Sequence, residues 1–142
     1  MKHVKVLIAL AAVLAAYGAA ADGRVEAQYW DRSVAEFPVL AGEADDAPRL
    51  QRAVDASANK VLFVPAGDYR LAQTLVITNF CSVLMHKGAR FLAEKPMDFV
   101  VRVNFSPVFK ARDILDFGTF FKGGRIDGCG VASCMSIHGY IH

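Results

Sequence analysis

The sequence predicts an all-β fold built from short, stacked strands, and three observations support this. Short apolar runs recur from residue 60 onward, separated by Gly, Pro, Asn or Asp. Beyond the N-terminal segment only residues 46–58 have a helical pattern, which disfavours an alternating βαβ sheet. The hairpin dipeptide Asp-Gly occurs only at Asp22-Gly23 and Asp127-Gly128, and neither connects a convincing strand pair. A solenoid of parallel coils therefore fits better than a β-sandwich.

The first 21 residues have the order of a secretory signal peptide. Two lysines precede an apolar run over residues 6–16, and Ala19-Ala20-Ala21 provides small residues for cleavage before Asp22. The run is shorter than the ~20 residues that a membrane span needs. We therefore expect a secreted, periplasmic or extracellular protein with no membrane association after cleavage.

Length and charge limit the partners that the mature chain is expected to have. The 142 residues suit one domain, with 16 Lys and Arg against 14 Asp and Glu. Removal of Lys2 and Lys5 with the signal leaves equal numbers of basic and acidic residues. No strongly basic face is implied, so nucleic acid is not an expected partner.

One helix is expected over residues 46–58, after an irregular lead-in at residues 22–43. Its apolar face would consist of Leu50, Ala53, Val54 and Ala58. Asp46 can cap the first turn, and the helix would cover the open end of the strand stack. The expected strands lie at residues 61–64, 69–71, 75–77, 81–85, 90–92, 99–105, 123–128 and 135–138.

Two segments resemble the pectate-lyase superfamily. Residues 44–48, with the helix after them, lead into Val64-Pro65-Ala66-Gly67-Asp68-Tyr69, which is similar to the opening "VPAGxY" of those proteins. Residues 123–130 (GGRIDGCG) are similar to the "GGxIDGxG" turn of polygalacturonase-like enzymes. The resemblance implies that residues 44–142 form the N-terminal coils of a right-handed parallel β-helix with a capping α-helix. It also implies a secreted glycosidase or lyase that degrades a pectin- or uronate-type polysaccharide.

The resemblance does not supply an active site. The family's hydrolase segments (Asn-Thr-Asp, Asp-Asp, Gly-His-Gly and Arg-Ile-Lys) do not occur after residue 128, and no aspartate cluster suits the calcium of the lyases. We therefore assign no catalytic residue, no metal ligand and no substrate-binding residue, and expect no cofactor unless the whole protein is a calcium-dependent lyase. The chain is expected to be an inactive N-terminal fragment of a longer protein. The alternative is a non-catalytic carbohydrate-binding or adhesion module, of the tailspike kind, with an undetermined oligomeric state.

Several polar and aromatic residues remain as candidates for binding a glycan. Asp45-Asp46 and Asp127 are better explained as helix-capping and turn residues, and Asp113 and Asp116 flank an apolar pair. Arginines could pair with uronate carboxylates if they lined one face; they are Arg70, Arg90, Arg102 and Arg125. The remaining candidates are the histidines His86 and His138 and the rings of Trp30, Tyr69 and Tyr140.

The three cysteines leave two alternatives. Cys129 and Cys134 are close enough in sequence to form a disulfide in an oxidising compartment, with Cys81 left as a small buried residue. Free thiols at all three positions are the other alternative. Their spacing matches no zinc motif.

Overall fold

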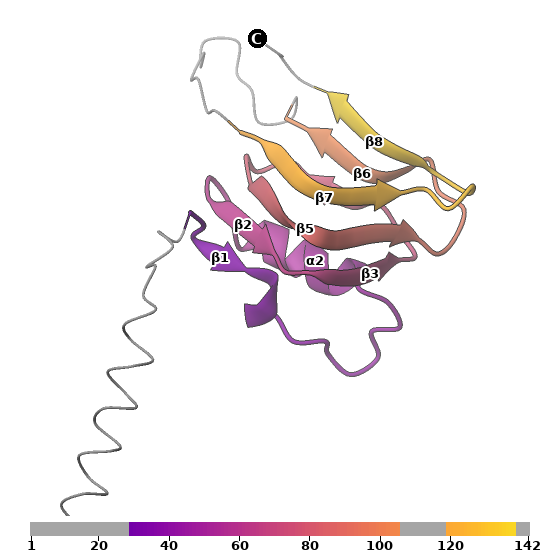
Figure 1. The fold of residues 1–142 in the computed structure, drawn as a ribbon, viewed down its shortest axis with the longest axis horizontal. Helices are drawn as coiled ribbons and strands as arrows, with labels where there is room; N and C mark the ends of the chain where they lie inside the picture. Colours follow the sequence, from indigo (N-terminus) through magenta and orange to yellow (C-terminus); the bar gives the residue numbers. More distant parts are fainter. Residues whose placement is uncertain (1–28, 106–118, 139–142) are drawn as a thin grey trace, which may run out of the picture.

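The computed structural model describes residues 29–105 and 119–138. The expected signal peptide, Asp113, Asp116 and Tyr140 lie outside these ranges. The described part is mostly β-strand, with one α-helix and one short 3-10 helix (Figure 1). The elements are β1 (Arg32–Ser33), η1 (Val34–Glu36), α2 (Ala47–Asp55), β2 (Val61–Val64), β3 (Gly67–Leu71), β4 (Leu75–Ile77), β5 (Ser82–Ala93), β6 (Phe99–Asn104), β7 (Phe121–Asp127) and β8 (Ser133–His138).

All strand pairings in the described part are parallel. One sheet has the order β1-β2-β5-β3, with β7 also paired to β5, and a second sheet has the order β4-β6-β8. Strands that are distant in sequence therefore lie side by side, and the chain passes upward from β1 to β8 in Figure 1. The expectation of a mostly β fold with parallel stacking is confirmed.

The long strand β5 accounts for two strands that we expected to be separate. Its first part pairs with β2, from Val61↔Ser82 onward, and its second part pairs with β3, from Gly67↔Ala89 onward. The Pro65-Ala66 turn between β2 and β3 therefore lies beside the middle of β5. Strand β7 follows both parts of β5 in turn, with a register shift between Met85 and Arg90.

Both sheets contribute to the hydrophobic core. Alternate residues of β2 and β3 are buried, as expected for strands with one apolar face. Tyr69 pairs with Phe91 and Phe91 with Ile126, so these side chains form an interior row across three strands. The largest fully buried side chains are Phe91, Leu50, Leu62, Leu71, Leu75, Ile77, Val34, Val54, Val64, Val83, Val100 and Val101.

Helix α2 packs on β3 and β4 but is shorter than the sequence predicted. It ends at Asp55, and Ala58 is exposed rather than part of the apolar face. Ser57 is buried in its place, and its Oγ donates a hydrogen bond of 2.7 Å to the carbonyl of Ala53. The expected apolar positions Leu50, Ala53 and Val54 are buried.

Asp46 lies at the expected N-cap position, but its side chain makes no capping hydrogen bond and binds the free edge of β3 instead. Its backbone N–H donates to the carbonyl of Arg70 at 2.8 Å, and its Oδ2 accepts from the Arg70 N–H at 2.9 Å. Asp45 makes the bond at the start of the helix instead, since its Oδ1 accepts from the N–H of Ala47 at 2.8 Å. The two carboxylates thus accept hydrogen bonds from backbone N–H groups at the helix start and at a strand edge.

Gln51 satisfies the edge of β4 in the same way. Its Oε1 accepts from the N–H of Val76 at 3.0 Å, and its Nε2 donates to the Val76 carbonyl at 2.9 Å. The side-chain amide therefore replaces a neighbouring strand at this position. Together with β1 beside β2, these contacts cover the N-terminal edges of the sheets, as the sequence predicted for this helix.

Candidate functional site

Strands β3, β5 and β7 place charged side chains on one outer face. Tyr69 is buried, so its neighbours Asp68 and Arg70 point away from the core. Register pairs Asp68 with Arg90 and Arg90 with Arg125, and Asp127 lies two residues after Arg125. We call this set of five charged residues the arginine face.

The central arginine of this face is held by an acid on the neighbouring strand. Arg90 Nε donates to Asp68 Oδ1 at 2.7 Å, and its Nη2 donates to Oδ2 at 2.5 Å, which is a bidentate pair. The hydrogen bonds from Arg90 lower the pKa of Asp68, and the same bonds raise the pKa of Arg90. Both side chains remain about half exposed, at 46% and 44%.

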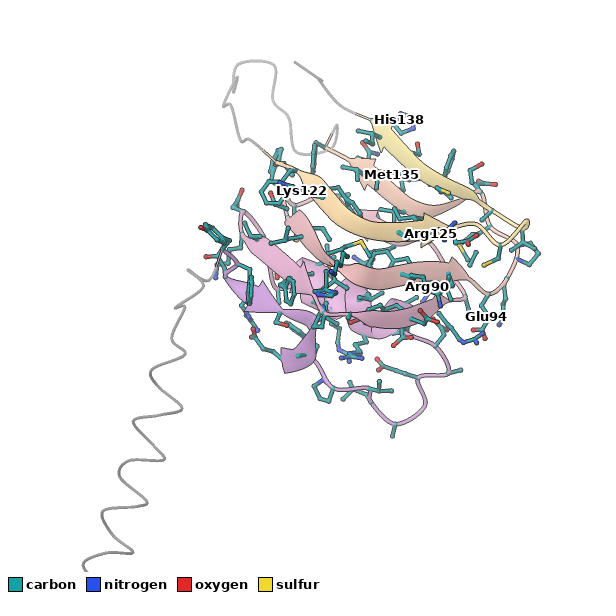
Figure 2. All side chains as sticks on the ribbon, viewed as in Figure 1. Arg90, Glu94, Lys122, Arg125, Met135 and His138 are labelled. Carbon is teal, nitrogen blue, oxygen red and sulfur yellow. The ribbon has the colours of Figure 1, made fainter. Side chains whose placement is uncertain are left out.

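The two outer arginines are held less firmly. Arg70 Nη1 lies 4.0 Å from Glu94 Oε1, which is the limit for an ion pair. Arg125 is exposed and forms no ion pair with any residue in the described ranges. Figure 2 shows Arg125 on β7 beside Arg90 on β5. Among the described residues, Arg125 therefore has no acidic partner, whereas its neighbour Arg90 is already paired.

Three of the four arginines named from the sequence share this face, but Arg102 does not. It lies on β6 in the other sheet, in register with Val76 and Ser136. Its Nη2 is 3.8 Å from Asp98 Oδ2. Arg102 is therefore a useful control for the other three.

The aromatic candidates differ in what their rings contact. The buried Tyr69 donates from its hydroxyl to the carbonyl of Pro65 at 3.0 Å, so it packs the corner between β2 and β3 and offers no ring to a sugar. Trp30 stacks on Phe63 with ring centroids 4.2 Å apart. One face of the Trp30 ring is therefore already covered by protein.

The remaining polar candidates lie outside the arginine face or serve local structure. His86 is exposed, and its Nδ1 accepts from the N–H of Gly88 at 3.0 Å, while His138 is exposed on β8. Asp127 Oδ1 accepts from the N–H of Cys129 at 2.8 Å, which confirms its predicted turn role.

The cysteines divide into one buried and two exposed thiols. Burial raises the pKa of Cys81 to about 12, so this residue is a small core side chain. Cys129 and Cys134 are free in the structure, and their Sγ atoms contact the carbonyls of Asp127 and Ile126, at 3.7 and 3.4 Å. The two thiols lie at adjacent peptide groups at the end of β7, and their disulfide remains a prediction.

We expect two of the three thiols of the reduced protein to react quickly with a thiol-specific disulfide reagent. Cys129 and Cys134 are exposed, whereas Cys81 is buried and stays protonated at neutral pH. A colorimetric thiol count in buffer and then in denaturant measures the difference. Replacement of Cys81 by Ala should leave the fast count at two, and a fast count of three would contradict the burial of Cys81.

Across residues 29–105 and 119–138, no group of three or more His, Cys, Asp or Glu side chains could together bind a metal ion. Within the same ranges, no helix has the length and apolar character needed to span a membrane.

Comparison with known proteins finds no relative of this chain. No family model, curated protein or solved structure matches the chain.

Proposed function

We propose that this chain is a right-handed parallel β-helix of the pectate-lyase type that binds an acidic polysaccharide on its arginine face. It would act outside the cytoplasm as part of a secreted, polysaccharide-active protein of the hydrolase or lyase kind. The parallel order of both sheets and the two segments at residues 64–69 and 123–130 support the fold. The arginine face supports the ligand.

The observation that carries the proposal is the register of Arg90 and Arg125 on neighbouring strands. Adjacent strands are ~4.8 Å apart, so the two guanidinium groups can contact neighbouring anionic groups of one polymer. Guanidinium matches the geometry of a carboxylate and can bind it through two parallel hydrogen bonds. A uronate polymer presents carboxylates repeatedly, and therefore fits this face better than a neutral glucan.

The acids of the arginine face favour binding over cleavage as the role of these residues. Hydrolysis of a glycosidic bond uses two carboxyl groups, one as acid and one as base or nucleophile. Asp68 is engaged by Arg90, and Asp127 by the backbone of the turn. This arrangement favours the non-catalytic carbohydrate-binding module as the second candidate function, in which binding occurs without new reducing ends or unsaturated products.

Replacement of Arg125 by Ala is expected to weaken binding of an oligogalacturonate about fivefold, which is the size of one exposed charge contact. Titration calorimetry at low ionic strength would measure the affinity, because salt screens exposed charges. Arg102→Ala is the matched control, since it removes the same charge from the other sheet. Equal losses for the two variants, or equal binding of a neutral glucan, would contradict the proposal.

A further inference from the structure

We infer that Asp68 is an internal competitor for the ligand: its carboxylate occupies the Nε/Nη2 edge of the Arg90 guanidinium, and an acidic polysaccharide must displace it to bind that edge together with Arg125. This inference rests on the proposed function and concerns the regulation of the same face. Three observations support it: the order of the charges on the paired strands, the geometry of the Asp68–Arg90 ion pair and the exposure of both side chains.

The order of charges places Arg90 between an acid and a base. Asp68 on β3, Arg90 on β5 and Arg125 on β7 occupy equivalent positions on three neighbouring strands. All three are exposed on the outer side of the sheet. A polyanion that reaches Arg125 therefore finds its second arginine next to a carboxylate of the protein.

The pairing geometry lets only one carboxylate bind the Nε/Nη2 edge of Arg90 in a bidentate manner. Asp68 uses the edge of the guanidinium formed by Nε and Nη2, with both hydrogen bonds made. A ligand carboxylate that binds in the same bidentate manner needs such an edge. On this edge Arg90 can therefore form both hydrogen bonds with Asp68 or with a ligand carboxylate, but not with the two at once.

The exposure of the pair makes the exchange feasible. Asp68 and Arg90 are both about half exposed, so water can replace each bond as it opens. Asp68 also has a second arginine, Arg70, two residues away on the same side of β3, and Arg70 already acts on the Asp68 carboxylate electrostatically. Asp68 therefore keeps a neighbouring cation when Arg90 turns to the ligand.

A polymer is better placed than a single anion to make this exchange. Attachment at Arg125 raises the effective concentration of the next carboxylate beside Arg90, so the second contact becomes intramolecular. A single uronate would have to compete with Asp68 without that advantage. The competing acid thus favours long, densely charged chains over short ones.

The test replaces Asp68 by Asn and measures the affinity for an oligogalacturonate by calorimetry. We expect Asp68→Asn to raise the affinity about threefold to fivefold, because one competing charge contact is lost. Glu36→Gln is the matched control: Glu36 is an exposed carboxylate that pairs with Arg32 at 2.7 Å beside β1, away from the arginine face. Its affinity should stay within twofold of the wild type.

A second background separates competition at Arg90 from a general gain of positive charge. In the Arg90→Ala protein Asp68 has no Arg90 guanidinium to occupy, so Asp68→Asn should change the affinity by less than twofold. An equal rise in both backgrounds would overturn the inference, as would no rise in the wild-type background. Urea unfolding of each variant would confirm that all remain folded.

The outcomes distinguish the inference from the function beneath it. If the wild type binds and Arg125→Ala weakens binding while Asp68→Asn has no effect, the inference fails and the proposed function stands. If neither the wild type nor Asp68→Asn binds the oligogalacturonate, both fail.

Discussion

Replacement of Phe91 by Ala is expected to reduce the free energy of unfolding by about 3–5 kcal/mol. Phe91 has no exposed surface and is the largest of the fully buried side chains. Its ring meets Tyr69 edge to face at 5.8 Å and Phe121 at 6.4 Å, so it links three neighbouring strands. The cavity would lie between β3, β5 and β7, where the paired backbones restrict collapse.

Equilibrium urea unfolding, followed by circular dichroism, would measure this change. Val39→Ala is the control, because Val39 is 55% exposed and a change there should cost less than about 0.5 kcal/mol. A loss at Phe91 no larger than the loss at Val39 would contradict the placement of Phe91 at the centre of the core.

Replacement of Gly123 by Ala is expected to cost about 2–5 kcal/mol, for two separate reasons. Gly123 has a φ of +80°, which is unfavourable for a residue with a Cβ. An added Cβ would also overlap the carbonyl oxygen of Met85 on the adjacent strand β5. Backbone atoms cannot move aside without breaking the β5–β7 pairing.

Gly130→Ala separates these two reasons. Gly130 also has a positive φ, of +74°, but an added Cβ would meet nothing within 4 Å. Its replacement should cost only the conformational part, about 1–2 kcal/mol. Urea unfolding of the two variants gives the difference, and equal losses would show that β7 does not approach β5 closely at Gly123.

The strands with one buried side were the most predictable part of the fold. Val61–Val64 and Leu75–Ile77 occur where the apolar runs predicted them, because burial on one side demands a visible pattern. The division of β5 into two strands was wrong, because the pattern breaks at the exposed residues His86 and Lys87 while the backbone stays extended.

Contacts made through polar side chains could not be read in the same way. The pairing of Asp46 with Arg70 and of Gln51 with Val76 depends on how α2 docks against the strand edges. A polar residue on a helix gives no sign of such a role in its own sequence. Asp46 was expected to cap the helix because an aspartate directly before a helical pattern is typical of an N-cap, and the sequence does not distinguish this use from binding a strand edge.

The arginine face was visible in the sequence only as a list of residues. Whether arginines share a face depends on strand register, and the chain between β5 and β7 contains β6 and a longer connection than the chain between β3 and β5. No fixed repeat therefore connects Asp68, Arg90 and Arg125. A one-residue slip in either pairing would have turned an arginine toward the core.

Because β3, β5 and β7 are paired in parallel, the outer surface carries one outward-facing side chain per strand at regular intervals. The spacing between these side chains is set by backbone hydrogen bonds between the strands and not by the side chains themselves. The residue type at such a position can therefore change while the position itself stays fixed. Such a scaffold can acquire preference for a differently charged polymer by single substitutions, without rebuilding the core beneath them.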